Sequence, residues 1–479
     1  EQMNLFKDMV CYQEEVRDPS RMAEVLNRVI EKAFRGSAPA QINVPRDYWT
    51  QVVDIELPPI VRFERQGGGK EAIENAAKIL SKAKFPVILS GAGVVLGGAI
   101  EECKKLAEKL DAPVCNGYQH NDSFPGSHPL AVGPLGYNGS KAAMELISKA
   151  DVVLALGTRL NPFSTLPGYG IDYWPKNAAI IQVDMNPDRI GLTKKVSVGI
   201  CGDSKQVAQQ ILDKLSADAG NIAREERKNL IHKSKSAWLQ TLSGLDHEED
   251  DPGTVWNKEA RERDKDRMSP RQAWRAIQDA LPQEAIISSD IGNNCAIGNA
   301  YPTFEKPRKY LAPGLFGPCG YGFPAILGAK IGCPETPVVG FAGDGAFGIS
   351  MNEMSSCARD EWPAITMVIF RNYQWGAEKR NSILWFDDNF VGTELDPELS
   401  YAKVANACGL KGVTCKTMEE TTNAIKQSCE DQEKGITTFI EIILNQELGE
   451  PFRRDAMKKP VKVAGIKRED MKKQSSLNS

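Results

Sequence analysis

Three oxygen-bearing groups in the C-terminal half of the chain have the types and spacing of a magnesium site. Asp344 stands in a Gly-Asp-Gly sequence, Asn372 follows 28 positions later, and the backbone carbonyl of Gln374 comes two residues after that. A carboxylate, an amide oxygen and a carbonyl are hard ligands, and Mg²⁺ commonly takes one or two carboxylates together with phosphate oxygens. Gly343 and Gly345 would let the backbone approach a diphosphate closely. The pattern predicts a magnesium-diphosphate site that lacks the lysine of a Walker-type loop.

A strand-helix-strand unit is needed to bring these groups together. Residues 338–342 form an apolar run that ends at the Gly-Asp-Gly sequence, and residues 365–370 form a second run that ends at Arg371-Asn372. Residues 352–360 between them are predicted to form a short helix. A crossover of this length joins neighbouring parallel strands, so both polar residues would lie at the carboxyl edge, where open α/β sheets bind ligands. Alone, Gly-Asp-Gly is common turn chemistry, and the second half at the right distance favours a site.

The stretch 343–376 resembles the signature of thiamine-diphosphate enzymes, in which Gly-Asp-Gly is followed after some two dozen residues by Asn-Asn. Here 25 residues separate Gly345 from the dipeptide. Its first position is Arg371, whereas the metal-binding second Asn is kept as Asn372. The resemblance implies thiamine diphosphate and Mg²⁺ as cofactors, with Asp344, Asn372 and Gln374 as the metal ligands.

Two further elements carry the same resemblance. The turn after a predicted strand at 285–289 is implied to contact the diphosphate, and the glycine-rich stretch 317–328 matches the element that supports the bent cofactor. Cys319 stands where a large apolar side chain is common, and we expect it to be a small apolar filler rather than a reactive thiol. The implied cofactor-binding residues are Gly292, Asn293, Asn294, Gly317, Cys319, Gly343, Asp344, Gly345, Ala346, Asn372 and Gln374.

The run after Asn372 is rich in cations and aromatic residues, and Lys379 and Arg380 are the candidates there, with Arg371, for binding anions at the active site. A cationic lining suits a sulfonate, a carboxylate or a phosphate, whereas an ordinary charged helix surface explains each residue equally well by itself. The run, with 317–324 and 448–460, resembles family members that convert sulfoacetaldehyde and phosphate into acetyl phosphate and sulfite. An acetolactate-synthase-like carboligase acting on pyruvate, and a polypeptide that binds the cofactors without turnover, are the alternatives.

Alternating strands and helices predict an α/β fold with two doubly wound parallel-sheet domains, preceded by the C-terminal remnant of a third. The predicted segments are 1–50 (remnant of a pyrimidine-binding domain), 51–70 (linker), 71–215 (central Rossmann-like domain, expected to hold no nucleotide), 216–267 (charged linker), 268–447 (diphosphate- and Mg-binding domain) and 448–479 (tail). In the family a catalytic glutamate comes from the earlier part of the first domain. We expect that glutamate to be missing from this chain, and Glu14 and Glu15 to be solvated charges.

Composition excludes several classes of partner. The net charge is −4, and no apolar run approaches the roughly 18 residues of a membrane span, so neither nucleic acid nor a membrane is expected as a partner. The 11 cysteines contain no C-x-x-C pair and the four histidines show no metal-ligand spacing. We therefore expect a cytoplasmic protein with reduced thiols. The family resemblance implies a homodimer or homotetramer.

Overall fold

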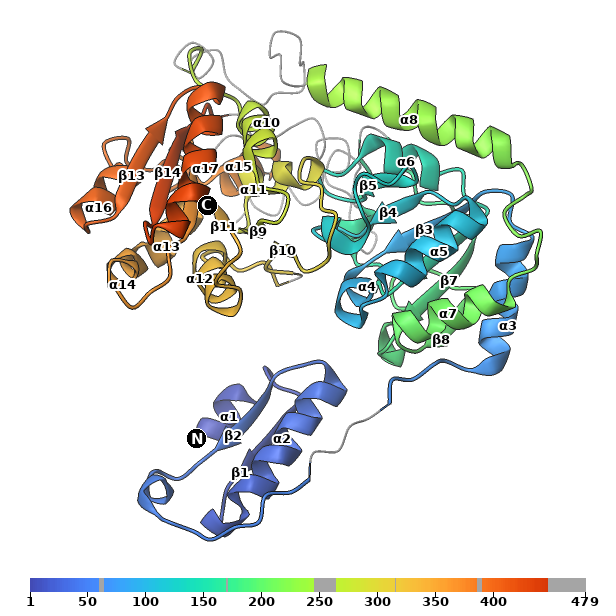
Figure 1. Ribbon diagram of the computed structural model, residues 1–479, viewed down its shortest axis with the longest axis horizontal. Coiled ribbons are helices and arrows are strands. Elements are labelled where there is room, and N and C mark those ends of the chain that lie inside the picture. Colours follow the sequence, from blue (N-terminus) through green and yellow to red (C-terminus); the bar gives the residue numbers. More distant parts are fainter. Residues whose placement is uncertain (60–63, 169–170, 245–263, 315, 386–389, 447–479) are drawn as a thin grey trace, which may run out of the picture. The chain divides into compact units, whose positions relative to one another are not determined.

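The computed structural model describes residues 1–59, 64–168, 171–244, 264–314, 316–385 and 390–446. The chain divides into two compact units, Glu1–Arg65 and Gln66–Ser479 (Figure 1). The predicted tail 448–479 and residues 245–263 of the predicted charged linker lie outside the described residues. Within the described ranges, no helix combines the length and the apolar character needed to cross a bilayer. All 11 cysteines fall in the described part of the chain, and all are free thiols.

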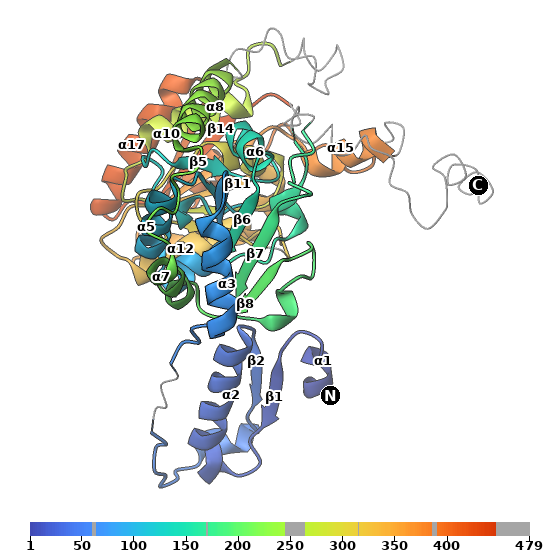
Figure 2. The ribbon, with the colours of Figure 1, turned by 90° about the vertical axis from the view of Figure 1, so that its right-hand side faces the viewer.

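Unit 1 is a small parallel pair of strands with one long helix. β1 Tyr12–Glu15 pairs with β2 Ala40–Asn43, and α2 Met22–Gly36 connects them and runs alongside both (Figure 2). The remaining elements are α1 Gln2–Phe6, η1 Pro19–Arg21 and η2 Arg46–Thr50. The fully buried apolar residues that pack together in this unit are Val16, Val25 and Val29. Large apolar side chains are exposed, including Phe34 at 79% and Trp49 at 73%.

Strand β1 is missing from the sequence-based prediction because its sequence, Tyr-Gln-Glu-Glu, is polar. The strand is held by backbone pairing and by an ion pair on one face. The Arg28 guanidinium donates to both oxygens of Glu14 at 2.8 Å, and these bonds, with one from Tyr12, lower the pKa of Glu14 to about 2. The expectation that Glu14 is simply solvated is therefore wrong, whereas Glu15 is exposed, with Arg17 3.9 Å away.

The first sheet of unit 2 is fully parallel, in the order β5-β4-β3-β6-β7-β8. This order is the doubly wound arrangement of a Rossmann-like domain. The strands are β3 Pro86–Ser90, β4 Val114–Asn116, β5 Ala131–Pro134, β6 Val152–Leu156, β7 Ala179–Asp184 and β8 Val198–Cys201. β3 and β6 are buried along their whole length, because helices cover both faces of such a sheet. The helices and turns around it are α3 Lys70–Ser81, α4 Ala92–Gly97, α5 Ile100–Leu110, η3 Asn121–Ser123, α6 Lys141–Ile147, η4 Pro162–Thr165, η5 Pro187–Arg189 and α7 Ser204–Lys214.

Helix α8 Arg224–Gly244 corrects the prediction of an exposed charged connector at 216–267. The helix has 21 residues and packs against α6. Ile231, Trp238 and Leu242 are buried at 3%, 7% and 8% exposure, and Arg227 is buried at 1%. These side chains form a narrow stripe among charged residues, which is why composition alone suggested a solvated segment.

The second sheet is also parallel, in the order β10-β9-β11-β12-β14-β13. Its strands are β9 Ile286–Ser289, β10 Tyr310–Leu311, β11 Val338–Gly343, β12 Thr366–Arg371, β13 Lys411–Cys415 and β14 Thr438–Ile443. Its helices and turns are α10 Pro270–Ala280, α11 Asn293–Ile297, η7 Gly298–Ala300, α12 Gly322–Gly332, α13 Asp344–Ser350, η8 Met351–Glu353, α14 Met354–Cys357, α15 Gly376–Trp385, α16 Tyr401–Ala407 and α17 Met418–Glu433. This is the second of the two doubly wound sheets predicted from the sequence.

Alternate residues of the strands enter two separate cores, one on each face of this sheet. Val339 and Phe341 of β11 pack with α10 and α17 in one core. Val338 and Ala342 of the same strand pack with α12, α13 and α16 in the other. Both cores hold the central strands rigidly, so the loops that follow β11 and β12 start from fixed points.

The predicted crossover is confirmed, with one correction to its helix. β11 and β12 are neighbouring parallel strands, with Gly343 opposite Phe370. The helix predicted at 352–360 is confirmed over α14 and the end of η8 before it, but it stops at Cys357, and a further helix that was not predicted, α13, begins already at Asp344. The alternative that Gly-Asp-Gly is only a tight turn is not borne out, because Gly345 lies within the first turn of α13.

Candidate active site

A cleft of about 210 Å³ opens at the carboxyl edge of the second sheet. Its walls are the segments that follow β9 and β12 and the first turn of α13, which begins directly after β11, together with residues 317 and 319. The chain leaves β9 for the edge strand β10 and returns to β11 on the opposite side of β9, so β9 and β11 flank the switch point of the sheet. Open α/β sheets bind ligands at such a point. The lining residues are Ile291, Gly292, Asn293, Asn294, Cys295, Gly317, Cys319, Gly343, Asp344, Gly345, Ala346, Asn372, Gln374, Trp375, Gly376, Ala377 and Glu378.

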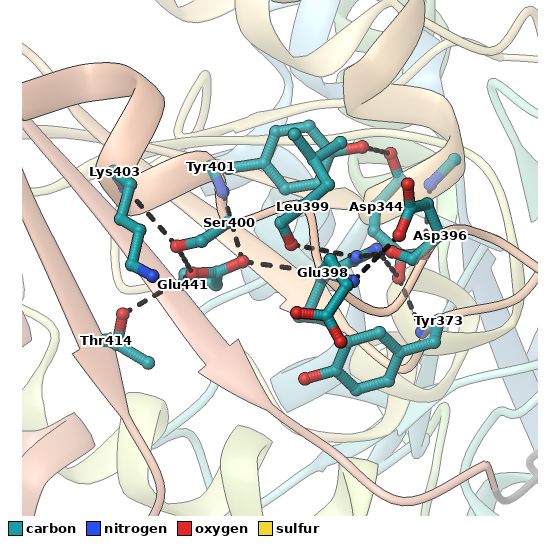
Figure 3. A network of polar contacts seen from close by, with 12 residues as sticks. Asp344, Tyr373, Asp396, Glu398, Leu399, Ser400, Tyr401, Lys403, Thr414 and Glu441 are labelled. Atoms are coloured by element: carbon teal, nitrogen blue, oxygen red, sulfur yellow. Dashed lines mark hydrogen bonds and ion pairs between the residues drawn. The ribbon is translucent and has the colours of Figure 1, made fainter. Parts of the chain in front are cut away.

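The Asp344 carboxylate is buried at 1% exposure and is held from two sides. Its Oδ1 accepts from the backbone N–H of Gly345 at 2.9 Å. Its Oδ2 accepts from the backbone N–H of Tyr373 at 2.7 Å and from Arg371 Nη1 at 3.1 Å (Figure 3). Burial raises the pKa of Asp344 to about 6, although Arg371 and the two N–H groups act in the opposite direction. A divalent cation at this carboxylate would offset the cost of burying its charge.

Asn372 and Gln374 lie beside Asp344 because β12 ends next to β11. Asn372 is 2% exposed and Gln374 is 3% exposed. Tyr373 between them has φ +62°, a left-handed conformation that is uncommon for a tyrosine. This conformation accompanies the bond from the Tyr373 N–H to Asp344, so the loop after β12 is tied to the first turn of α13. Gln374 is fixed in turn by a bond from its Nε2 to the Gln446 carbonyl at 3.1 Å.

Two glycines line the cleft, one required by its backbone conformation and the other leaving open space. Gly292 has φ +122° and ψ 174°, a conformation that only glycine adopts readily. Gly343 has an ordinary φ of −70°, and a Cβ built there would meet no atom within 4 Å. Packing within the described chain therefore does not require glycine at 343, whereas a group bound in the cleft would.

Asp290 positions the glycine-rich stretch and was not singled out from the sequence. Its carboxylate accepts from the backbone N–H groups of Gly322 at 2.7 Å, Ile291 at 2.8 Å and Gly320 at 3.1 Å. Burial raises the pKa of Asp290, and the three N–H groups lower it. The carboxylate thereby joins the end of β9 to the loop that contributes Gly317 and Cys319 to the cleft.

The thiamine pyrophosphate enzyme central domain matches residues 73–211, and the thiamine pyrophosphate enzyme C-terminal TPP-binding domain matches residues 290–442. A probable sulfoacetaldehyde acetyltransferase of Rhizobium meliloti is 77% identical over 99% of this chain and 80% of that protein. The chain belongs to the thiamine pyrophosphate enzyme family.

Two further comparisons agree with this assignment. The sulfoacetaldehyde acetyltransferase of Roseovarius nubinhibens is 74% identical over 99% of this chain and 79% of that protein. The crystal structure of benzoylformate decarboxylase from Polynucleobacter necessarius superposes with a TM-score of 0.72 at 19% identity, over 94% of this chain and 78% of that one, which supports the fold alone. The family resemblance and the α/β fold predicted from the sequence are confirmed.

The cleft of this thiamine pyrophosphate enzyme fits a diphosphate with a divalent cation. Asn293 Nδ2 and Asn294 Oδ1 both belong to residues that line the cleft, are buried, and have no hydrogen-bond partner among the described residues. A bound phosphate with its cation would satisfy such groups. In the described ranges, no group of three or more His, Cys, Asp or Glu side chains is placed to hold a metal ion, so a metal here would depend on amide and carbonyl oxygens beside Asp344.

The predicted site residues fall into two groups. All eleven residues predicted to bind the cofactor line the cleft, although their contacts with a cofactor stay predictions. Lys379 and Arg380 are not among the described residues that line it. The Lys379 ammonium forms an ion pair with Glu394 and donates to Gln446 at 3.2 Å. Arg380 is 2% exposed and lies over the ring of Tyr137, 5.7 Å from its centroid.

Trp375 is the main lining residue that the sequence argument missed. A Cβ built on Gly345 would lie 2.8 Å from the Trp375 indole, so this ring packs directly on the backbone of the Gly-Asp-Gly turn. Cys319 lies in the cleft wall and is exposed to solvent, and partial desolvation of its thiol, with Asp290 and Glu378 nearby, raises its pKa. A raised pKa disfavours the thiolate, whereas the role of a filler stays a prediction.

Proposed function

We propose that this thiamine pyrophosphate enzyme converts sulfoacetaldehyde and phosphate into acetyl phosphate and sulfite. The observation that carries the proposal is the identity of 77% and 74% to two proteins named for sulfoacetaldehyde acetyl transfer, over 99% of this chain in each case. The matched regions cover 99% of this chain and so include the cleft and the run from Trp375 to Arg380. The carboligase alternative, which condenses pyruvate, lacks comparable support.

The reaction is internally balanced. The bond between the sulfonate sulfur and carbon breaks, and sulfite leaves with its electron pair. The aldehyde carbon is oxidised to the acyl level while the neighbouring carbon gains a proton and becomes a methyl group, so no external oxidant is needed. Thiamine diphosphate supplies, when bound, the electron sink for this chemistry. A phosphate oxygen then takes the acyl group.

In this proposal the role of the chain's own residues is to bind and orient the metal ion and the diphosphate. In our proposal Asp344, Asn372 and the Gln374 carbonyl would hold Mg²⁺, whose positive charge would favour the binding of the diphosphate. Gly292 and Gly343 leave room for the diphosphate beside the backbone. Support comes from the burial of Asp344 at 1% exposure and from its three hydrogen bonds, which fix the direction of the carboxylate.

The two substrate anions require cations, and we propose Arg380 and Lys379 for this role. The Lys379 ammonium is already paired with Glu394, so it would have to exchange that partner to bind a sulfonate or a phosphate. Arg380 is buried beside Tyr137, where a guanidinium binds an anion more strongly than it does at an exposed site. This assignment rests on charge and burial.

We further propose that the chain works as a homodimer or a homotetramer. Large apolar side chains of unit 1 are exposed, with Leu5 at 70%, Phe34 at 79% and Leu57 at 76%, which is more than isolated surface residues require. Light scattering at several concentrations tests this proposal. A mass equal to one chain at all concentrations would contradict it.

The function is tested by incubating the chain with thiamine diphosphate, Mg²⁺, sulfoacetaldehyde and phosphate. We expect sulfite and acetyl phosphate to form in equal amounts, and neither to form with Asp344→Asn. Pyruvate replaces sulfoacetaldehyde in a parallel reaction. Acetolactate formation without sulfite release would support the carboligase instead, and cofactor binding without any product would support the binding-only alternative.

A further inference from the structure

Arg371 replaces the first asparagine of the family signature, and its surroundings are unusual. It ends β12 and is 0% exposed. One guanidinium nitrogen donates to Asp344 Oδ2 at 3.1 Å, and the other donates to the carbonyl oxygens of Asp396 and of Leu399, the latter at 3.0 Å. Figure 3 shows these bonds converging between the loop after β11 and the segment before α16. The side chain is thus buried in the protein and is not among the described residues that line the cleft.

Glu441 supplies the opposite charge on the far side of the guanidinium. It lies on β14, is 2% exposed, and has Oε1 3.7 Å from Arg371 Nε. Its carboxylate accepts from Ser400 Oγ at 2.7 Å and from the Tyr401 N–H at 3.2 Å. Tyr401 Oη donates to the Asp344 carbonyl oxygen at 2.9 Å, which closes a ring of contacts back to the metal-binding loop.

Aromatic rings fix the plane of the same guanidinium. Its central carbon lies 4.3 Å from the centroid of Tyr373 and 5.4 Å from that of Tyr401. A planar fork that stacks on rings and donates in fixed directions is a property of arginine, and lysine does not reproduce it. A cation beside a metal-binding carboxylate would by itself oppose a second cation, so the charge of Glu441 is needed for balance.

We infer that Arg371, balanced by Glu441, is a positioning residue that fixes the Asp344 carboxylate for a divalent cation. The inference rests on the proposed function and assigns to Arg371 a role other than anion binding. Arg371 and the Tyr373 N–H use both lone pairs of Oδ2, and the Gly345 N–H uses one of Oδ1, so one lone pair of Oδ1 is left for the metal. Residues that orient a ligand in this way commonly change metal affinity about 10- to 100-fold when they are replaced.

The test measures the Mg²⁺ concentration that half-saturates the binding of thiamine diphosphate, with the cofactor in excess. Binding is followed by tryptophan fluorescence, because Trp375 lines the cleft. We expect Arg371→Lys, which keeps the charge but loses the fork, to raise this concentration about 10- to 100-fold. Glu441→Gln, which keeps the shape but loses the balancing charge, is expected to raise it about 10-fold or more.

The control is Lys411→Gln. Lys411 lies on β13 of the same sheet and forms an ion pair with Asp431, away from the cleft. We expect this variant to lower the melting temperature without moving the Mg²⁺ midpoint. If Arg371→Lys and Glu441→Gln also lose only thermal stability and bind Mg²⁺ like the parent, Arg371 is merely structural and the inference is wrong.

Failure of the proposed site is recognised separately. A parent chain that shows no Mg²⁺-dependent fluorescence change with thiamine diphosphate contradicts the site itself, and the inference with it. If the parent chain shows the fluorescence change and the variants have the same Mg²⁺ midpoint as the parent, only the inference about Arg371 is contradicted. Should Arg371→Lys not fold, Glu441→Gln decides, because replacing a carboxylate by an amide of the same shape leaves the packing intact.

Discussion

Replacing Gly343 by alanine separates the needs of the fold from the needs of the ligand. Gly343 is the last residue of β11, with φ −70° and ψ 159°, an extended conformation open to any residue. No atom lies within 4 Å of a Cβ built at this position, and the residue lines the cleft. The added methyl group therefore meets no part of the described protein and occupies space that we assign to the diphosphate.

Gly343→Ala is expected to raise the stability of the fold and to lower the affinity for the cofactor. Gly-to-Ala substitution at a compatible position reduces the conformational entropy of the unfolded chain and stabilises the fold by about 0.4–1 kcal/mol. That gain corresponds to a rise of about 1–4 °C in melting temperature for a domain of this size. A methyl group forced against a bound ligand costs about 1–3 kcal/mol, as does overpacking in a core, which weakens binding about 5- to 150-fold.

The assay combines thermal unfolding of the ligand-free chain with a calorimetric titration of thiamine diphosphate in excess Mg²⁺. Gly328→Ala is the matched control. Gly328 lies in α12, also has no atom within 4 Å of its Cβ, and does not line the cleft. We expect both variants to unfold at or above the parental temperature, because alanine is also favoured over glycine inside a helix. Only Gly343→Ala should bind the cofactor more weakly.

The reasoning would be refuted by a Gly343→Ala variant that binds thiamine diphosphate as tightly as the parent does. A large loss of stability in that variant would instead refute the statement that the backbone conformation at Gly343 is open to any residue. Equal weakening by Gly328→Ala would show that the effect does not come from the cleft.

Three further predictions follow from buried charges. Arg227 donates to five carbonyl oxygens, of Lys84, Leu110, Asp111, Gly220 and Ile222, at 2.6–2.9 Å. Arg227→Met should therefore destabilise the fold by at least about 3 kcal/mol in urea unfolding, and a change below about 1 kcal/mol would contradict this. Burial, with the charge of Arg159, lowers the pKa of His120 to about 4, so the unfolded chain binds the extra proton as pH falls from about 6.5 to 4. The free energy of unfolding should therefore fall as the pH is lowered across that window, and His120→Gln should make this pH dependence flatter. Equal slopes of the free energy of unfolding against pH in the parent and in His120→Gln would contradict the prediction. Arg380→Ala should raise KM for sulfoacetaldehyde or for phosphate, and unchanged KM values for both would exclude Arg380 as an anion-binding residue.

Much of the site follows from the sequence because its signals are local. Apolar runs at 338–342 and 365–370 identify β11 and β12, and the spacing of Asp344 and Asn372 places both residues at one edge. The run 285–289 similarly places Gly292 after β9. Parallel strands buried on both faces are the elements most readily read from a sequence, because their apolar runs are continuous.

The missed features depend on partners that are distant in the chain. Arg371 looked like a cation available to a substrate, but its Glu441 partner is 70 positions away and reaches it only because β12 and β14 are neighbours. Asp290 acts through N–H groups about 30 residues later. In α8, the buried residues Arg227, Ile231 and Trp238 are separated by charges, and only packing reveals which side of the helix is covered.

The most direct test of the account is a crystal structure of the chain with thiamine diphosphate and Mn²⁺ in place of Mg²⁺, using the anomalous signal to locate the metal. We predict a single peak at the end of β11 and β12, within about 2.0–2.3 Å of an Asp344 carboxylate oxygen, the Asn372 amide oxygen and the Gln374 carbonyl oxygen. A metal bound elsewhere, or a diphosphate outside the cleft that Gly292 and Gly343 line, would contradict the account.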